Sequence, residues 1–103
     1  MNQEAPTVPK IEFLVAEELE PPYRVLIHND DITPMDFVVE ILLTYFDLLQ
    51  DKAMQVMLTA HHSGIAVVGT WSRDQALWRI DQAHQRARAN NYPLKFTAEP
   101  ESE

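Results

Sequence analysis

The stretch Asn29-Asp30-Asp31-Ile32-Thr33-Pro34-Met35 separates two strongly apolar runs, and the fold follows from what lies on either side of it. Residues 23–28 (YRVLIH) predict a β-strand before it, and residues 34–46 (PMDFVVEILLTYF) predict a helix after it. We expect Thr33 at the N-cap, Pro34 at the first helical position and Asp36 as the acidic half of a capping box. A well-formed turn with a helix start is the simplest interpretation. The same residues also hold two carboxylates, an amide and a hydroxyl at one corner.

The rest of the chain predicts two more helices and two more strands. We expect a helix over residues 51–62 that ends at a left-handed Gly64, and a buried strand over residues 65–69. A capping box at Ser72 predicts a helix over residues 73–90, and residues 94–97 alternate as a strand does. One side of the first of these helices is expected to contain Met54, Met57, Ala60 and His61. The apolar face of the second is expected to contain Ala76, Leu77, Ile80, Ala83, His84 and Ala87.

The predicted order β-α-α-β-α-β favours an α+β fold, a compact α/β sandwich in which a three-stranded sheet packs against three helices. The chain has 103 residues, of which 46% are hydrophobic, and this suits one small domain. We divide it into an acidic, proline-containing flexible arm (1–22), a core domain (23–98) and an acidic tail (99–103).

Composition excludes several classes of function. The chain contains no cysteine, so disulfides and thiolate metal sites are ruled out. The net charge is −8 and most of this net negative charge lies in the two terminal segments, so we expect no nucleic-acid partner. No apolar run reaches membrane-spanning length and no secretory signal is recognised, so we expect a cytoplasmic protein without a membrane partner.

The polar residues that can carry chemistry point to binding rather than catalysis. A metal site would have to combine His61 with Asp30 or Asp31 through the fold, and a hydrolase would lack a nucleophile. Carboxylates, an asparagine amide and an imidazole are instead suited to an ammonium group. Methionine side chains beside them would supply an adaptable apolar pocket. These groups together describe a site for the first residue of a peptide, with no cofactor and no resident metal.

Two motifs carry a resemblance to a known family. Asn29-Asp30-Asp31-x-Thr33-Pro34-Met35-Asp36-Phe37-Val38, followed by Met57-Leu58-x-x-His61-x-x-Gly64, resembles the ClpS adaptor of the ATP-dependent Clp protease. The likeness covers residues 23–97. It implies a non-enzymatic adaptor that binds the free N-terminus of N-degron substrates beginning with Leu, Phe, Tyr or Trp. It also implies that the adaptor delivers these substrates to a ClpA- or ClpC-type AAA+ unfoldase, and we expect a monomer.

The resemblance also implies roles for individual residues. Asn29, Asp31 and His61 would contact the α-ammonium group, with Asp30 in the same acidic loop. The side-chain pocket would comprise Ile27, Thr33, Met35, Val38, Met57, Ala60 and Leu94. Met35 would exclude β-branched first residues by steric clash, and Ala60 stands where the family usually has valine. Asp74 and Arg79 fall on the surface that would dock the unfoldase.

Two alternatives remain open at this point. One is a diverged ClpS-like interaction module that binds a different partner through Leu77, Trp78 and an apolar patch around Phe13. The other is a small metal-binding protein or metal-dependent enzyme. Binding to a peptide that begins with Phe separates the first alternative from the adaptor, and metal analysis tests the second.

Overall fold

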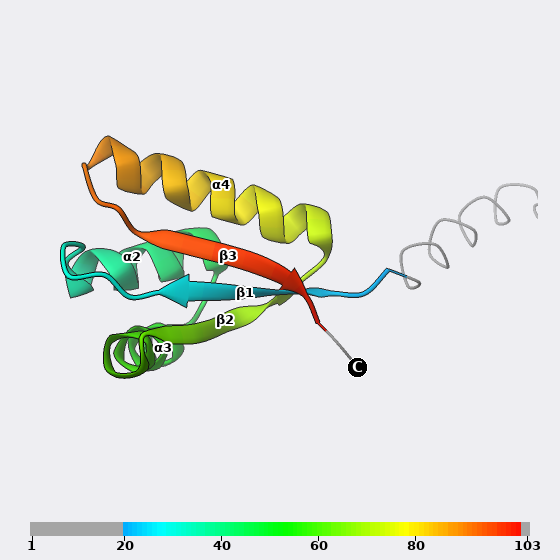
Figure 1. The fold of residues 1–103 in the computed structure, drawn as a ribbon, viewed down its shortest axis with the longest axis horizontal. Helices are drawn as coiled ribbons and strands as arrows, with labels where there is room; N and C mark the ends of the chain where they lie inside the picture. Colours follow the sequence, from blue (N-terminus) through cyan, green and yellow to red (C-terminus); the bar gives the residue numbers. More distant parts are fainter. Residues whose placement is uncertain (1–19, 102–103) are drawn as a thin grey trace, which may run out of the picture.

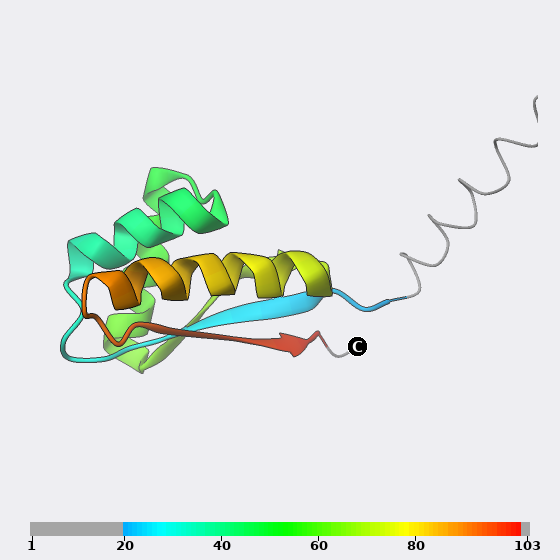
Figure 2. The same ribbon diagram turned by 90° about the horizontal axis from the view of Figure 1, so that it is seen from above.

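The computed structural model of the chain describes residues 20–101. The elements follow the predicted order, and their bounds are β1 (Tyr23–His28), α2 (Met35–Phe46), α3 (Gln50–Ser63), β2 (Ile65–Trp71), α4 (Arg73–Ala89) and β3 (Lys95–Pro100). The strands form one antiparallel sheet in the order β2-β1-β3, and the three helices cover one of its faces (Figures 1 and 2). The predicted α+β sandwich is therefore confirmed.

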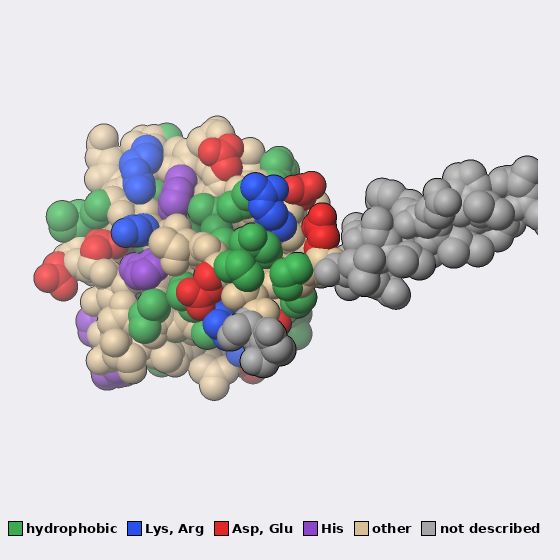
Figure 3. Space-filling model, turned by 45° about the vertical axis from the view of Figure 1, so that its right-hand side comes forward, with side chains coloured by type: hydrophobic (Ala, Val, Ile, Leu, Met, Phe, Trp, Pro, Cys, Tyr) green, Lys and Arg blue, Asp and Glu red, His purple; other side chains and the backbone are tan. Residues whose placement is uncertain are grey.

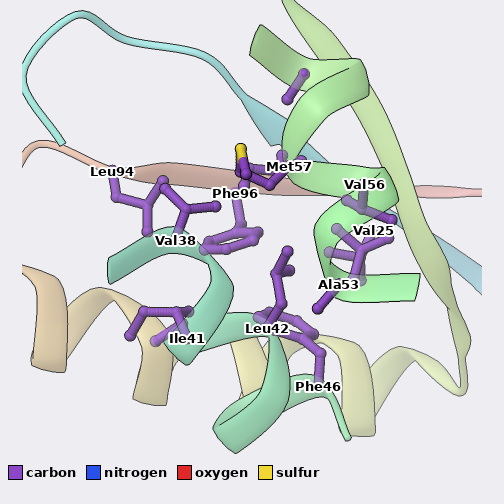
Figure 4. Packing of buried hydrophobic residues seen from close by; sticks show 14 of the residues in the cluster. Val25, Val38, Ile41, Leu42, Phe46, Ala53, Val56, Met57, Leu94 and Phe96 are labelled. Carbon is purple, nitrogen blue, oxygen red and sulfur yellow. The ribbon is translucent and has the colours of Figure 1, made fainter. Parts of the chain in front are cut away.

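The central position of β1 explains why its sequence is so apolar. Val25 and Ile27 are 0% and 1% exposed because they face the helices from the middle of the sheet. In Figure 4 the side chains of α2, α3 and the sheet converge on a single core. Its largest fully buried side chains are Phe46, Ile27, Ile41, Leu42, Leu94, Val25 and Val68.

The other face of the sheet is open and of mixed character (Figure 3). Ile65 and Val67 of β2 are exposed there, while Ala66 and Val68 point into the core. The prediction of a buried strand therefore holds for one face only, because the helices cover one side of the sheet. Its successive side chains accordingly alternate between core and solvent.

The start of α2 differs from the prediction. Pro34 occupies the N-cap position with extended dihedral angles, and no side chain of the described residues caps this helix. The Thr33 hydroxyl donates to Asp30 at 3.0 Å instead. The predicted roles of Thr33 and Asp36 in capping were wrong, since neither makes a capping bond to α2. The Asp30 carboxylate instead accepts from both the hydroxyl and the backbone N–H of Thr33.

The bounds of other elements differ from the predicted ones by a few residues. Helix α3 extends by one residue at each end beyond the prediction, and Gly64 ends it in the expected left-handed conformation at φ 89°. The Ser72 hydroxyl caps α4 by accepting from the Gln75 backbone N–H at 3.3 Å, also as predicted. Strand β3 begins after Leu94 and continues through Glu99 and Pro100, which we had assigned to the tail.

Three of the side chains that we predicted along one side of α3 and on the apolar face of α4 are exposed, namely Met54, His61 and Leu77. Leu77 is 43% exposed and Met54 is 40% exposed, so each helix buries a narrower stripe than the sequence suggested. The small residues Ala76, Ala83 and Ala87 are fully buried in α4, which lets this helix lie close to the sheet. The arm residues 1–19 lie outside the described part of the chain, as does the Phe13 patch. Within residues 20–101 no helix has the length and apolar character needed to span a bilayer.

Candidate functional site

A pocket of about 300 Å³ lies at the end of the sheet where β1 leads into α2. Residues 20 and 101 lie at the opposite end of the molecule (Figure 1). All eleven residues predicted for peptide binding line this pocket, which the structure builds from Ile27, His28, Asn29, Asp30, Asp31, Ile32, Thr33, Pro34, Met35, Val38, Met57, Ala60, His61 and Leu94. The structure therefore brings together residues from β1, α2, α3 and the segment before β3.

The floor of the pocket is apolar and belongs to the protein core. It comprises side chains that are between 1% and 8% exposed, namely Ile27, Val38, Met57, Ala60 and Leu94. Val38 comes from α2, Met57 from α3 and Leu94 from the segment before β3, and the three line the same pocket (Figure 4). The shape of the floor is thus fixed by the same packing that holds the domain together.

The rim of the pocket is polar and faces solvent. Asn29, Asp31 and His61 are all exposed. They line the same pocket although Asn29 and His61 are far apart in sequence. The backbone N–H of Asn29 donates to the Gly64 carbonyl at 3.0 Å, and this bond ties the end of β1 to the end of α3. His61 lies in the last turn of α3, so the bond places it beside the acidic loop.

Asp30 differs from its neighbour Asp31 because its carboxylate is used within the loop. One oxygen accepts the backbone N–H groups of Ile32 and Thr33 at 2.8 and 2.7 Å. The other accepts the Thr33 hydroxyl at 3.0 Å. Asp30 therefore fixes the shape of the loop, whereas Asp31 presents its carboxylate to solvent at the rim.

The mouth of the pocket includes residues that we did not predict from the sequence. Ile32, Pro34 and His28 also line it. The His28 imidazole lies within 2.8 Å of the Thr97 hydroxyl on β3, so one of its ring nitrogens is already bound. The signal that could have found Ile32 is its place inside the motif, where a large apolar residue interrupts a polar run.

The two adjacent histidines serve different surfaces. The rings of His61 and His62 are 5.5 Å apart, and only His61 lines the pocket. This agrees with the helical geometry, in which successive side chains point about 100° apart. Among residues 20–101 no group of three or more histidine, aspartate or glutamate side chains is placed to hold a metal ion.

The residues predicted to dock an unfoldase lie on α4, away from the pocket. The Asp74 side chain is 93% exposed in the first turn of α4, but that of Arg79 is only 16% exposed. The Arg79 guanidinium donates to the Tyr45 carbonyl and to Asp47, each at 3.0 Å, and lies 5.2 Å from the Trp71 ring centroid. Arg79 thus joins α4 to the end of α2, and the two predicted residues are not equally available to a partner.

The family model described as "ATP-dependent Clp protease adaptor protein ClpS" matches residues 18–97. The chain belongs to the ClpS family. Two curated relatives illustrate the match, each an ATP-dependent Clp protease adapter protein ClpS. The relative from Oleidesulfovibrio alaskensis is 42% identical over 90 residues, covering 85% of this chain and 86% of that protein. The relative from Methylococcus capsulatus is 44% identical over 79 residues, covering 77% of this chain and 74% of that protein.

A solved structure of the family has the same fold. It is described as Agrobacterium tumefaciens ClpS2 bound to L-phenylalaninamide, and it aligns with a TM-score of 0.75 at 40% identity. The alignment covers 79% of this chain and 98% of that one. The comparisons therefore establish both the fold of this ClpS family member and its place among adaptors of the Clp protease.

Proposed function

We propose that this chain is an adaptor that binds the free N-terminus of proteins whose first residue is Leu, Phe, Tyr or Trp. It then delivers these N-degron substrates to a ClpA- or ClpC-type AAA+ unfoldase for degradation. The observation that carries the proposal is the division of one pocket into an exposed polar rim and a buried apolar floor. A peptide N-terminus has the matching division, with a charged amine next to an apolar side chain.

The rim selects the amine. An ammonium group loses its hydration when it binds, and this is costly unless each of its three protons finds an acceptor. Asp31 supplies the opposite charge, and Asn29 and His61 supply an amide oxygen and a ring nitrogen. Acetylation removes the charge and adds bulk, so an acetylated peptide loses these interactions and is not bound.

The floor selects the side chain. Burying a Leu or Phe side chain in an apolar site contributes roughly 2–3 kcal/mol. The relative described as bound to L-phenylalaninamide supports this assignment, because that ligand combines a free α-amino group with an aromatic side chain. Ala60 leaves more space than valine would at the same position, which favours the larger aromatic residues.

Delivery requires a second surface. Asp74 is exposed at the start of α4, together with Leu77 and Trp78, at the far end of the molecule from the pocket (Figure 1). A partner that docks there leaves the pocket open. In this arrangement the chain acts as a monomer that holds the substrate at one end and the unfoldase at the other.

Peptide titration tests the proposal, and the two adjacent histidines provide a matched control. We expect fluorescent peptides that begin with Leu, Phe or Trp to bind, and those that begin with Val or N-acetyl-Phe not to bind. His61→Ala should weaken binding of the Phe peptide at least tenfold, because the ammonium loses an acceptor. His62→Ala should leave it unchanged, because His62 does not line the pocket. Equal binding of Phe and N-acetyl-Phe peptides would contradict the proposal.

A further inference from the structure

Ile32 is an apolar residue at the pocket mouth that the recognition of a first residue does not use. Its side chain is 66% exposed. Within residues 20–101, Ile32 and Met35 are the only large apolar side chains that are both exposed and part of the pocket lining. The remaining apolar lining residues of β1, α2 and α3 are buried in the floor. Ile32 therefore extends the apolar surface of the site outward.

The loop holds Ile32 in a fixed position. Its backbone N–H donates to the Asp30 carboxylate at 2.8 Å, and the next N–H, of Thr33, donates to the same oxygen at 2.7 Å. The Thr33 hydroxyl adds a third bond to this carboxylate at 3.0 Å. A side chain carried by a loop that is already ordered loses little conformational entropy when a ligand covers it. Ile32 is therefore preorganised for contact.

The path of a bound peptide places its second residue near the mouth. If the ammonium lies at the rim between Asn29, Asp31 and His61, the first side chain enters the floor and the chain leaves outward. Successive side chains of an extended chain point to opposite sides, so the second side chain points away from the floor. Of the two exposed apolar residues in the pocket lining, Met35 is already assigned to the selection of the first residue, which leaves Ile32 for the second.

We propose that Ile32 is a specificity-determining residue that contacts the side chain of the substrate's second residue and favours an apolar residue there. This inference rests on the proposed function, because it needs the first residue to be bound as described. Covering the exposed part of Ile32 with a Leu side chain should tighten binding by about three- to tenfold relative to Ser.

The test compares Phe-Leu and Phe-Ser peptides of otherwise identical sequence. We expect the native chain to bind Phe-Leu about three- to tenfold tighter than Phe-Ser, and we expect Ile32→Ser to reduce this ratio to about one. Ile32→Leu should restore the preference. Leu58→Ser should leave the ratio unchanged, since Leu58 is 42% exposed on α3 but does not line the pocket.

The outcomes separate the two proposals. Tight binding of both peptides to the native chain, with equal affinities or with a ratio that Ile32→Ser does not change, would overturn the role of Ile32 alone. Failure of the native chain to bind either peptide would overturn the proposed function, and this inference with it.

Discussion

The backbone N–H of Asn29 donates to the carbonyl oxygen of Gly64 at 3.0 Å. This one bond joins the residue after β1 to the residue after α3, and it thereby brings the acidic loop to the same rim as His61. Gly64 has φ 89°, a conformation that glycine adopts without strain. The geometry of the rim therefore depends on a backbone conformation as well as on the polar side chains.

Gly64→Ala should lower the free energy of unfolding by about 1 kcal/mol, because a side chain at positive φ is strained. A Cβ atom there would meet nothing within 4 Å, so the cost is conformational and not steric. Urea unfolding measures it, with Ser63→Ala as the exposed helical control. Equal stability of the native chain and Gly64→Ala would show that the left-handed conformation costs nothing here.

Substitution of Asp30 should mainly affect stability, whereas substitution of Asp31 should mainly affect peptide binding. Asp30→Ala removes the acceptor of three hydrogen bonds and should lower the free energy of unfolding by about 1–2 kcal/mol. Asp31→Asn removes an exposed charge and should weaken binding of a Phe-initiated peptide about tenfold or more, with little change in stability. Thermal unfolding and peptide titration of both variants measure the two effects. The reverse pattern would show that the roles of the two carboxylates are exchanged.

Met35→Ala should admit Val and Ile at the first position of the peptide. Met35 is 44% exposed at the mouth, so its truncation widens the entrance without removing a core side chain. Affinities for Leu-, Val- and Ile-initiated peptides measure the change, and Met54→Ala on α3 serves as the control at similar exposure. If the Met35→Ala variant still does not bind Val-initiated peptides, a residue other than Met35 excludes β-branched first residues.

His84 should make stability depend on pH. Burial, together with the nearby charge of Arg88, lowers the pKa of His84, while Asp81 acts in the opposite direction. The unfolded chain therefore binds a proton more readily than the folded one as pH falls below about 6.5, so this contribution to stability is complete above that pH and declines below it. The neutral ring also accepts the Phe96 backbone N–H at 3.0 Å, which protonation of that nitrogen would prevent.

Unfolding free energies of the native chain and His84→Gln at pH 7.5 and 5.0 measure this dependence. We expect the native chain to lose more stability between the two values than the variant does, because the difference between the two proteins isolates His84 from the carboxylates. Parallel pH profiles would show that His84 does not contribute.

Arg79→Ala should lower the free energy of unfolding by about 1–2 kcal/mol, because the guanidinium joins Tyr45, Asp47 and Trp71. Asp74→Ala should change stability by less than about 0.5 kcal/mol, since that side chain is 93% exposed. Urea unfolding of both variants should precede any measurement of unfoldase binding. A stability of Arg79→Ala equal to that of the native chain would show that Arg79 is free for docking.

The order and type of every described element followed from sequence pattern, because apolar periodicity and turn residues are strong where one face of an element is buried. The eleven residues that the resemblance assigns to peptide binding line one pocket. The strand order β2-β1-β3 could not be read from the sequence, since it depends on how helices pack behind the sheet. A short apolar run predicted β2 as a buried strand, and such a run does not show whether one face of the strand or both are covered.

Competition for hydrogen bonds explains what was wrong at the start of α2. Thr33 is a good N-cap by type, but its hydroxyl and its backbone N–H both donate to Asp30, which orients the side chain toward the loop. The contacts of Arg79 on α4 could not be predicted from the sequence either. Its sequence position marks it as a surface charge, yet its contacts with Asp47 and Tyr45 come from a distant part of the chain.

The pocket opens at one end of the sheet, while the chain enters β1 and leaves β3 at the other (Figure 1). A polypeptide bound in the pocket therefore lies at the end of the domain opposite to the start of β1. Attaching the C-terminus to a sensor surface or a resin should consequently leave the mouth facing the sample, so the domain is suited to use as an immobilised reagent for unblocked protein N-termini.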